Sequence, residues 1–249
     1  MNNSEFERRF LLDYVWFGRM VLAHQNRVLN KAYLEDTDYA RRSACFLAMH
    51  TNLIQECEHV AAWLLALRRW AEMGTALIET LLRYAPGEAY LEDRLEGIAD
   101  GHELLRVSGI HRDRIVPQYF PEDLYNERVA DIWAGLAYYA NQQNDRATLY
   151  NKSKHAMMFL SSPKALNPEL EDNGPIALYA KDRRAESIQV SYAGLTYDPQ
   201  QPAIIARQTL GLAHALGDIL LFYMLQVHPE AEADINVMLH TRASMLILP

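Results

Sequence analysis

The residue types best suited to chemistry lie close together at Asn151, Lys152 and His155. On a helix, residues three and four apart share a face, so this spacing places an amide, an ammonium and an imidazole on one surface patch. Such a patch could bind an anion, and the imidazole could move a proton near neutral pH. Tyr150 and Lys154 lie beside these residues in the sequence. In the alternative interpretation, His155 only stabilises a helix C-terminus through the helix dipole, and the two lysines reach out to water.

The segment Tyr-Asn-Lys-Ser-Lys-His, residues 150–155, resembles a segment of bacterial helical proteins related to the HEPN superfamily. HEPN proteins are helical bundles, often dimeric, and many are metal-independent ribonucleases. Their motif is an Arg, then four to six intervening residues, then a His, commonly with Asn directly after the Arg. Asn151 and His155 match the Asn and His, whereas Tyr150 stands at the position of the Arg. Lys152 or Lys154 would have to supply the missing positive charge, although an ammonium does not reproduce the guanidinium fork.

Arg and His also recur elsewhere at the spacing that this resemblance requires. Three such pairs occur in the chain, about as many as chance predicts: Arg19/His24, Arg106/His111 and Arg207/His214. The resemblance therefore implies Asn151 and His155 as the catalytic residues and Tyr150, Lys152 and Lys154 as the anion- or RNA-binding residues. It implies no cofactor.

A metal-dependent reaction is the weaker alternative. Glu56 and His59 are three apart and share a helix face, which is half of a carboxylate-bridged di-iron site. The sequence contains no second Glu-x-x-His and no Cys/His pattern with zinc spacing. An acidic helix face is expected to be solvated and comprises Glu88, Glu92, Asp93, Glu96 and Asp100. Glu92 and Glu96 are four residues apart, which is not the spacing of a magnesium-binding Glu-x-x-Glu pair.

Long helices must position these residues. Apolar side chains at three- and four-residue steps predict helices over several stretches: residues 4–34, 39–72, 75–84, 88–107, 121–143, 203–227 and 230–242. Phe6, Phe10, Tyr14, Phe17 and Val21 form the apolar stripe of the first helix. Either Thr37 or Asp38 is expected to cap the second, and Gly74 to end it.

One β-hairpin interrupts the helical pattern. Residues 161–174 have loop composition, and the alternation over 187–192 predicts a strand that pairs with residues 176–181 through a turn at 182–185. The sequence thus predicts a mainly α fold, a multi-helix bundle with one small β-hairpin near 176–192. We expect one helical domain over 1–249 that carries the loop and hairpin as an insertion at about 161–201.

Composition and charge indicate which partners and which compartment to expect for this protein. A net charge of −8 disfavours binding to duplex DNA, which needs clustered Lys and Arg. The apolar stretch 210–227 contains His214 and Asp218, so it is expected to be a core helix and no membrane partner is expected. The start of the chain lacks the apolar core of a signal peptide, and two cysteines form no disulfide framework, which together indicate the cytoplasm. Long apolar helices and the apolar tail 245–249 indicate a homodimer.

Three functions follow from these observations. The first is an HEPN-like helical protein that binds or cleaves RNA. The second is a helical interaction or scaffold protein without enzymatic activity. The third is a metal-dependent helical-bundle hydrolase that uses Glu56 and His59.

Overall fold

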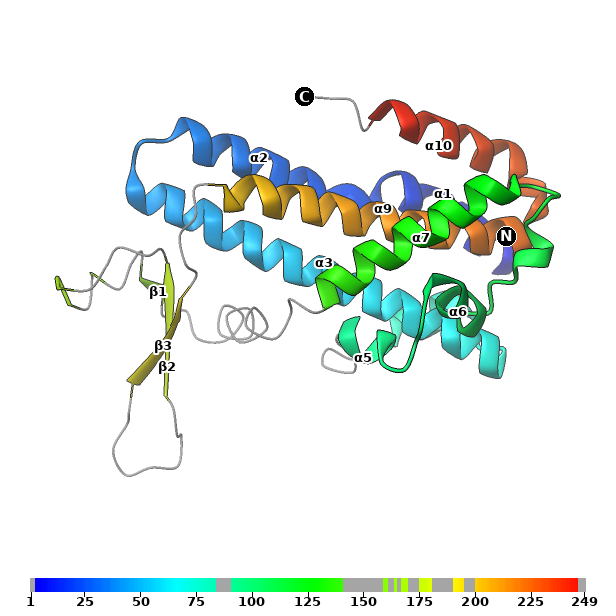
Figure 1. Ribbon diagram of the computed structural model, residues 1–249, viewed down its shortest axis with the longest axis horizontal. Coiled ribbons are helices and arrows are strands. Elements are labelled where there is room, and N and C mark those ends of the chain that lie inside the picture. The colour runs from blue at the N-terminus through cyan, green and yellow to red at the C-terminus, as the bar shows by residue number, and fades with distance from the viewer. Residues whose placement is uncertain are drawn as a thin grey trace. The chain divides into compact units, whose positions relative to one another are not determined.

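The structure is a computed structural model. It describes residues 3–83, 91–140, 159–160, 164, 167–169, 175–180, 190–194 and 200–245. Most of these residues are helical, which confirms the predicted mainly α class (Figure 1). The α-helices are α1 (Asn3–Trp16), α2 (Val21–Glu35), α3 (Tyr39–Met73), α4 (Leu77–Leu82), α5 (Leu91–Leu95), α6 (Gly101–Val107), α7 (Glu122–Ala140), α9 (Gln201–Val227) and α10 (Glu232–Met245). Short 3-10 turns are η1 (Gly18–Met20), η2 (Arg112–Arg114) and η4 (Pro229–Ala231).

The described chain forms two compact units. Unit 1 comprises 1–21, 57–140 and 211–249, and unit 2 comprises 22–56 and 141–210. Helices α3 and α9 each contribute residues to both units. The prediction of one helical domain over 1–249 stays a prediction.

The ends of α3 follow the local signals in the sequence. Asp38 Oδ1 accepts a hydrogen bond from Arg41 N at 2.9 Å, which satisfies a backbone donor of the first turn. Gly74 has a φ of +67° and its N–H donates to Trp70 O at 2.9 Å, which is how a glycine ends a helix in the left-handed region. Both predictions for this helix are confirmed.

The first predicted helix is wrong as a single element. It is divided between α1 and α2 by Phe17 and η1. The ring of Tyr14 lies so close to Gly18 that a Cβ at that position would meet the ring at 2.6 Å. The predicted stripe is also not the core face of α1, because Leu11 and Val15 are 0% and 1% exposed.

The predicted helix over 88–107 is likewise two helices, α5 and α6. Gly97 between them has a φ of +73°, a conformation that interrupts a helix and that favours glycine. Gly101 begins α6 against α7, where a Cβ would meet Val129 O at 2.5 Å. The absence of a side chain at Gly101 therefore allows α6 and α7 to pack closely.

The core of unit 1 is built around the second part of α9. Phe222 packs edge-to-face on Phe120 and at a tilt on Tyr125, with ring centroids 5.4 and 5.2 Å apart. By length and composition α9 is the one helix in the described part of the chain that could cross a membrane, and 78% of its most apolar window is buried inside the structure. Such burial is typical of a core helix.

In unit 2 a buried amide joins three helices. Asn26 of α2 is 0% exposed, and its Nδ2 donates to Met49 O at 3.1 Å and to Thr209 Oγ1 at 2.7 Å. Its Oδ1 accepts from Asn52 Nδ2 at 2.9 Å. Thr209 in turn donates to Ile205 O at 2.9 Å. These bonds fix the register of α2 against the nearby turns of α3 and α9.

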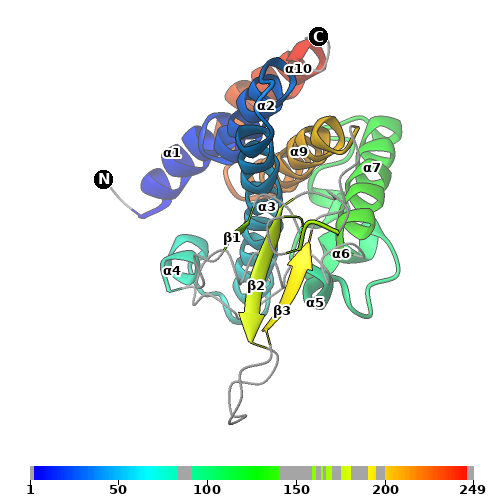
Figure 2. The same ribbon diagram turned by 90° about the vertical axis from the view of Figure 1, so that its left-hand side faces the viewer.

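The strands of unit 2 form a three-stranded antiparallel sheet in the order β1–β2–β3. They are β1 (Phe159–Leu160), β2 (Ile176–Ala180) and β3 (Val190–Gly194), and β2 and β3 lie side by side in Figure 2. The predicted two-stranded hairpin is not confirmed in that form, because β1 pairs with the other edge of β2. The predicted turn at 182–185 lies outside the described residues.

Candidate functional site

The predicted anion-binding face lies outside the residues that the structure describes. This applies to all five of its members: Tyr150, Asn151, Lys152, Lys154 and His155. Their predicted roles in RNA binding and catalysis stay predictions.

The Glu-x-x-His pair lies on α3. Glu56 is 1% exposed and His59 is half-buried, and the boundary between the two units falls between them. Among the described residues, no group of three or more His, Cys, Asp or Glu side chains is placed so that it could hold a metal ion. The described residues therefore add nothing to the metal-dependent alternative.

Asp100, the last member of the predicted acidic face, and Glu103 after it accept hydrogen bonds from backbone N–H groups. Asp100 Oδ1 accepts from Glu103 N at 2.9 Å, and Glu103 Oε2 accepts from Ala99 N at 2.8 Å. Two acids thus satisfy N–H groups at the start of α6 in the reciprocal manner of a capping box. Glu92 and Glu96 lie on or just after α5, and Glu88 is outside the described residues.

An arginine and a histidine do meet in unit 1, but they come from two different predicted pairs. Arg19 Nη1 donates to Ala213 O at 2.8 Å and lies 3.3 Å from His214 Nδ1. Arg19 Nε donates to Val15 O. The guanidinium lies against α9 at Gly217, where a Cβ would meet Arg19 Nε at 2.7 Å. Since its donors are directed at backbone carbonyls, Arg19 holds η1 on α9.

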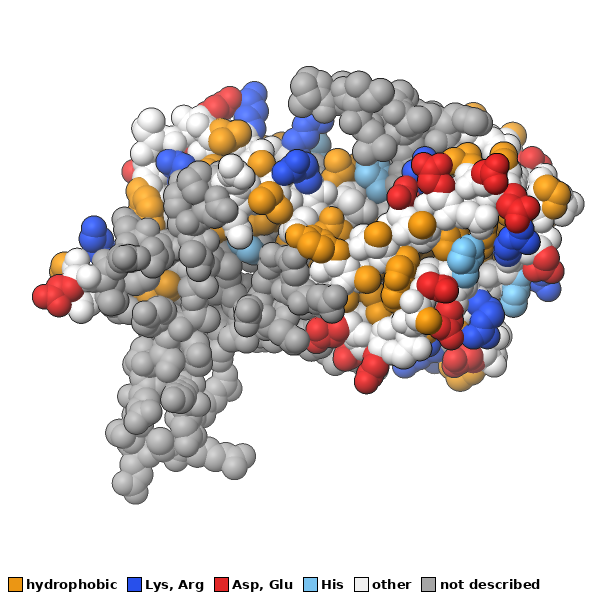
Figure 3. Space-filling view, viewed as in Figure 1, with side chains coloured by type: hydrophobic (Ala, Val, Ile, Leu, Met, Phe, Trp, Pro, Cys, Tyr) orange, Lys and Arg blue, Asp and Glu red, His pale blue; other side chains and the backbone are white. Residues whose placement is uncertain are grey.

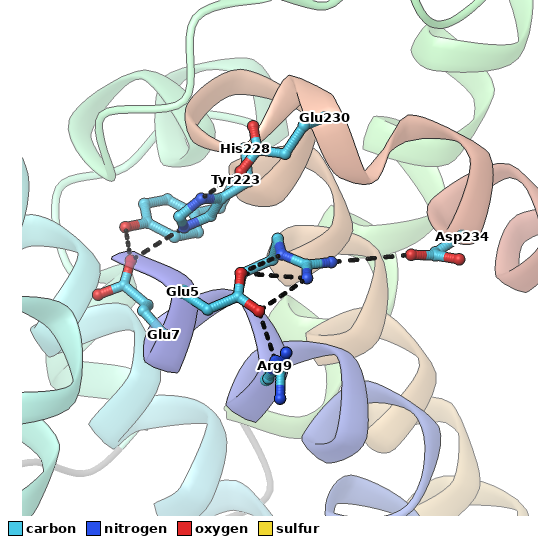
Figure 4. A network of polar contacts seen from close by, with 8 residues as sticks. Glu5, Glu7, Arg9, Tyr223, His228, Glu230 and Asp234 are labelled. Atoms are coloured by element: carbon cyan, nitrogen blue, oxygen red, sulfur yellow. Dashed lines mark hydrogen bonds and ion pairs between the residues drawn. The ribbon is translucent and has the colours of Figure 1, made fainter. Parts of the chain in front are cut away.

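The clearest polar network among the described residues surrounds Glu7 of α1 (Figure 4). Tyr223 Oη donates to Glu7 Oε1 at 2.7 Å. His228 Nε2 lies 3.5 Å from the same oxygen, and His228 Nδ1 lies 3.4 Å from Glu230 Oε1. Tyr223 and His228 are 1% and 2% exposed, so this side of the network is closed to solvent, whereas the side chain of Glu230 is 60% exposed. We call Glu7, Tyr223, His228 and Glu230 the Glu7 network.

The sequence around each member explains its place in the network. Tyr223 lies in the buried part of α9, with its ring edge-to-face on Trp70 at 4.9 Å. Burial raises the pKa of its hydroxyl well above the ordinary value, and the hydrogen bond to the Glu7 carboxylate raises the pKa further. His228 follows the end of α9, and Pro229 begins the 3-10 turn η4 directly after it. The chain therefore turns at His228 and brings Glu230 back to the imidazole.

Charged neighbours attach the same part of α1 to α10. Arg8 Nη2 lies 3.2 Å from Glu5 Oε2, and Arg8 Nη1 lies 3.9 Å from Asp234 Oδ2 (Figure 4). Arg9 Nε donates to Glu5 Oε1 at 2.5 Å, which holds the pKa of Glu5 below its ordinary value. Together with the Glu7 network, these pairs hold α1 against the end of α9 and the start of α10.

The Glu7 network brings together a phenol, an imidazole and two carboxylates. It contains no Ser, Thr or Cys that could act as a nucleophile; the hydrogen bond from Tyr223 joins α9 to Glu7 of α1, and the imidazole of His228 lies near Glu7 of α1 and Glu230 of η4. We interpret it as a buried polar connection that stabilises unit 1.

Charges of both signs are mixed on the part of the surface shown in Figure 3. Around α6 and the start of α7, Asp and Glu side chains alternate with Lys and Arg, and the described residues of this face show no continuous basic area.

Comparison with known proteins finds no match to a family model, to a curated protein or to a solved structure. Residue types and geometry therefore carry the functional argument.

Sequence reasoning missed the Glu7 network. Glu7 and Tyr223 are 216 positions apart, and neither belongs to a motif. A weak signal was the order His-Pro-Glu at 228–230, which places an imidazole directly after a helix and a carboxylate within the turn that follows.

Proposed function

We propose that this protein is an HEPN-like helical protein that binds RNA through the face formed by Asn151, Lys152 and His155. Cleavage would follow where His155 transfers a proton. The observation that carries the proposal is the segment Tyr-Asn-Lys-Ser-Lys-His at 150–155, with an amide, two ammonium groups and an imidazole. In this proposal the protein is a cytoplasmic homodimer that needs no cofactor.

The mainly α fold supports the proposal, because the resemblance requires a helical bundle. The acidic net charge of −8 favours a local contact over a broad electrostatic surface. Single-stranded RNA suits such a site, since a few cations can follow its backbone while the bases stack elsewhere. Lys152 and Lys154 would bind phosphates, and Asn151 would orient the ribose or phosphate beside the imidazole.

The test measures binding of a fluorescently labelled single-stranded RNA by anisotropy at several salt concentrations. The double variant Lys152→Ala/Lys154→Ala should bind more weakly and should lower the slope of log K against log salt by about 1.4, at about 0.7 for each phosphate contact on a single strand. Lys31→Ala is the matched control, because Lys31 on α2 is an exposed lysine that pairs only locally with Glu35. That control should bind as the wild type does.

His155→Ala separates binding from cleavage. It should retain RNA binding and abolish any cleavage of the same RNA followed on a denaturing gel. If the wild type binds RNA and all of these variants bind and cleave equally, the site is elsewhere. If the wild type binds no RNA at any salt concentration, the proposed function is wrong.

A helical interaction protein is the second candidate function. The observation that favours it is a set of exposed aromatic side chains on α1 and directly after it: Phe6, Phe10 and Phe17 are 45%, 38% and 66% exposed. Exposed aromatic side chains that lie close together are typical of protein contact surfaces.

A further inference from the structure

Helix α1 and the residue that follows it carry a row of aromatic rings on the outside of unit 1. Phe6 stacks on Phe10 with centroids 6.3 Å apart, and Phe10 stacks on Tyr14 with centroids 6.0 Å apart. Phe17 continues the row one turn later and is 66% exposed. We call these four residues the α1 row. At 1.5 Å per residue, the row extends for about 16 Å along the helix.

Phe6, Phe10 and Phe17 of the α1 row lie outside the face that α1 uses to pack within unit 1, whereas Tyr14 packs on Trp63 with ring centroids 4.9 Å apart. That packing uses Leu11 and Val15, which are 0% and 1% exposed. Hydrogen bonds and ion pairs from Glu7 and Arg8 then hold the helix in this orientation. These contacts orient α1 so that Phe6, Phe10 and Phe17 stay exposed.

The apolar area that the row leaves open is large for one helix. The exposed fractions of Phe6, Phe10 and Phe17 together equal about one and a half phenylalanine side chains, or about 300 Å² at about 200 Å² each. This is a substantial share of the about 800 Å² that each partner buries in a stable interface of standard size. The row can therefore form the apolar centre of a protein contact.

The charges beside the row indicate what kind of partner fits it. Glu5, Arg9 and Asp13 each precede a member of the row by one residue and follow one another at steps of one turn. Arg9 is strongly exposed at 67% of its side chain, and Asp13 is also exposed. An antiparallel copy of this helix presents the same charges in reverse order, so that Arg9 of each copy can face Asp13 of the other. A helix surface with opposite charges one turn apart is therefore complementary to an antiparallel copy of itself about a twofold axis.

We infer that the α1 row is the surface on which a second copy of this chain packs, with the two α1 helices antiparallel and the twofold axis near Leu11. This inference rests on the homodimer of the proposed function and names its contact surface. A membrane surface fits the row less well, because interfacial helices carry Lys and Arg on the polar face. On α1 the acids Glu5 and Asp13 flank Arg9.

The test is the mass of the full-length protein in solution, measured by sedimentation equilibrium over a range of concentrations. Arg9→Asp gives a copy with two acids at positions 9 and 13, and Asp13→Arg gives a copy with two bases. Each variant alone should dimerise at least about tenfold more weakly than the wild type, because like charges face each other. An equimolar mixture of the two should regain dimers within about threefold of the wild-type affinity, since the acidic and basic copies are complementary.

A second pair of variants tests the apolar part. Phe10→Glu/Phe17→Glu should weaken the dimer at least as strongly as the charge variants. Leu34→Glu is the matched control, because Leu34 on α2 is an exposed leucine outside the row and its replacement should leave the dimer unchanged. Circular dichroism of every variant checks that the helices are intact.

The outcomes separate the contact surface from the dimer itself. A wild type that stays monomeric at all concentrations refutes the dimer and, with it, the inferred surface. A dimeric wild type whose folded row variants all remain dimeric refutes the α1 row alone. Failure of the mixed charge variants to associate refutes the antiparallel arrangement. RNA binding is measured independently, so none of these results decides the RNA proposal.

Discussion

Removing the hydroxyl of Tyr223 should destabilise the protein near neutral pH, and the loss should disappear in alkaline solution. Tyr223→Phe keeps the ring and its edge-to-face contact with Trp70, but deletes the 2.7 Å hydrogen bond to Glu7. A hydrogen bond to a charged group contributes about 1.5–3 kcal/mol. Glu7 would also lose a donor in a nearly closed site. We therefore expect the free energy of unfolding to fall by about 2 kcal/mol.

The pH dependence follows from the raised pKa of Tyr223. In the folded protein the hydroxyl stays protonated, whereas in the unfolded chain it ionises near its ordinary pKa of about 10. A folded pKa above the unfolded pKa means that the stabilisation is fully present below about pH 10 and is lost as pH rises beyond it. The slope is about 1.4 kcal/mol per pH unit, so the wild type should lose about 2 kcal/mol relative to Tyr223→Phe by about pH 11.5.

The assay is urea unfolding followed by far-ultraviolet circular dichroism, for wild type and variant, at a series of pH values from neutral to alkaline. Other tyrosines are present in both proteins, so their contributions cancel in the difference. Tyr138→Phe is the control, because Tyr138 on α7 is 52% exposed and its replacement should change stability little at any pH. A constant difference in the free energy of unfolding between wild type and variant over the whole pH range would refute the reasoning. A variant as stable as the wild type at neutral pH would refute it as well.

Four further substitutions test the packing and one helix cap. Asn26→Ala should lower the free energy of unfolding by about 3 kcal/mol in urea titrations, because three buried hydrogen bonds at about 1 kcal/mol each are lost; a loss below about 1 kcal/mol would contradict this role. Gly101→Ala should lower the free energy of unfolding by about 2–3 kcal/mol, because its Cβ would meet a backbone oxygen at 2.5 Å. Gly135→Ala, whose nearest neighbour is 4.0 Å away, should instead raise the free energy of unfolding by about 0.5–1 kcal/mol by stabilising α7. Equal effects of the two glycine substitutions on the melting temperature would refute the close packing of α6 and α7. Asp100→Ala should cost about 1 kcal/mol through the lost cap of α6, and an unchanged melting temperature would contradict that role.

Helix boundaries with local causes could be predicted from the sequence. Asp38 and Gly74 delimit α3 by satisfying backbone groups within the neighbouring turn, so no distant contact is needed to recognise them. The burial of α9 could also be predicted from its long apolar run, since a helix that is apolar on most sides must be buried. The boundary at Gly18 was missed because the periodicity of apolar residues continues across it.

The orientation of α1 could not be predicted. Both Leu11 with Val15 and Phe6 with Phe10 make apolar stripes, and periodicity alone does not say which stripe faces the core. The choice depends on the shape of the surface that receives the helix and on partners far away in the sequence, such as Tyr223 for Glu7. Polar pairings of this kind are set by the tertiary structure, because any carboxylate on a helix can pair with many donors.

The amino-acid sequence by itself determined the helical class, the ends of α3 and the buried character of α9, and the anion-binding face at residues 150–155 stays a prediction. Each depends on a local pattern of residue types. Only the tertiary structure decided that Arg19 joins His214, that Glu7 receives the hydroxyl of Tyr223, and that the aromatic row of α1 faces outward. These depend on which helix surfaces meet, and the sum of many weak packing contacts decides that in the folded chain.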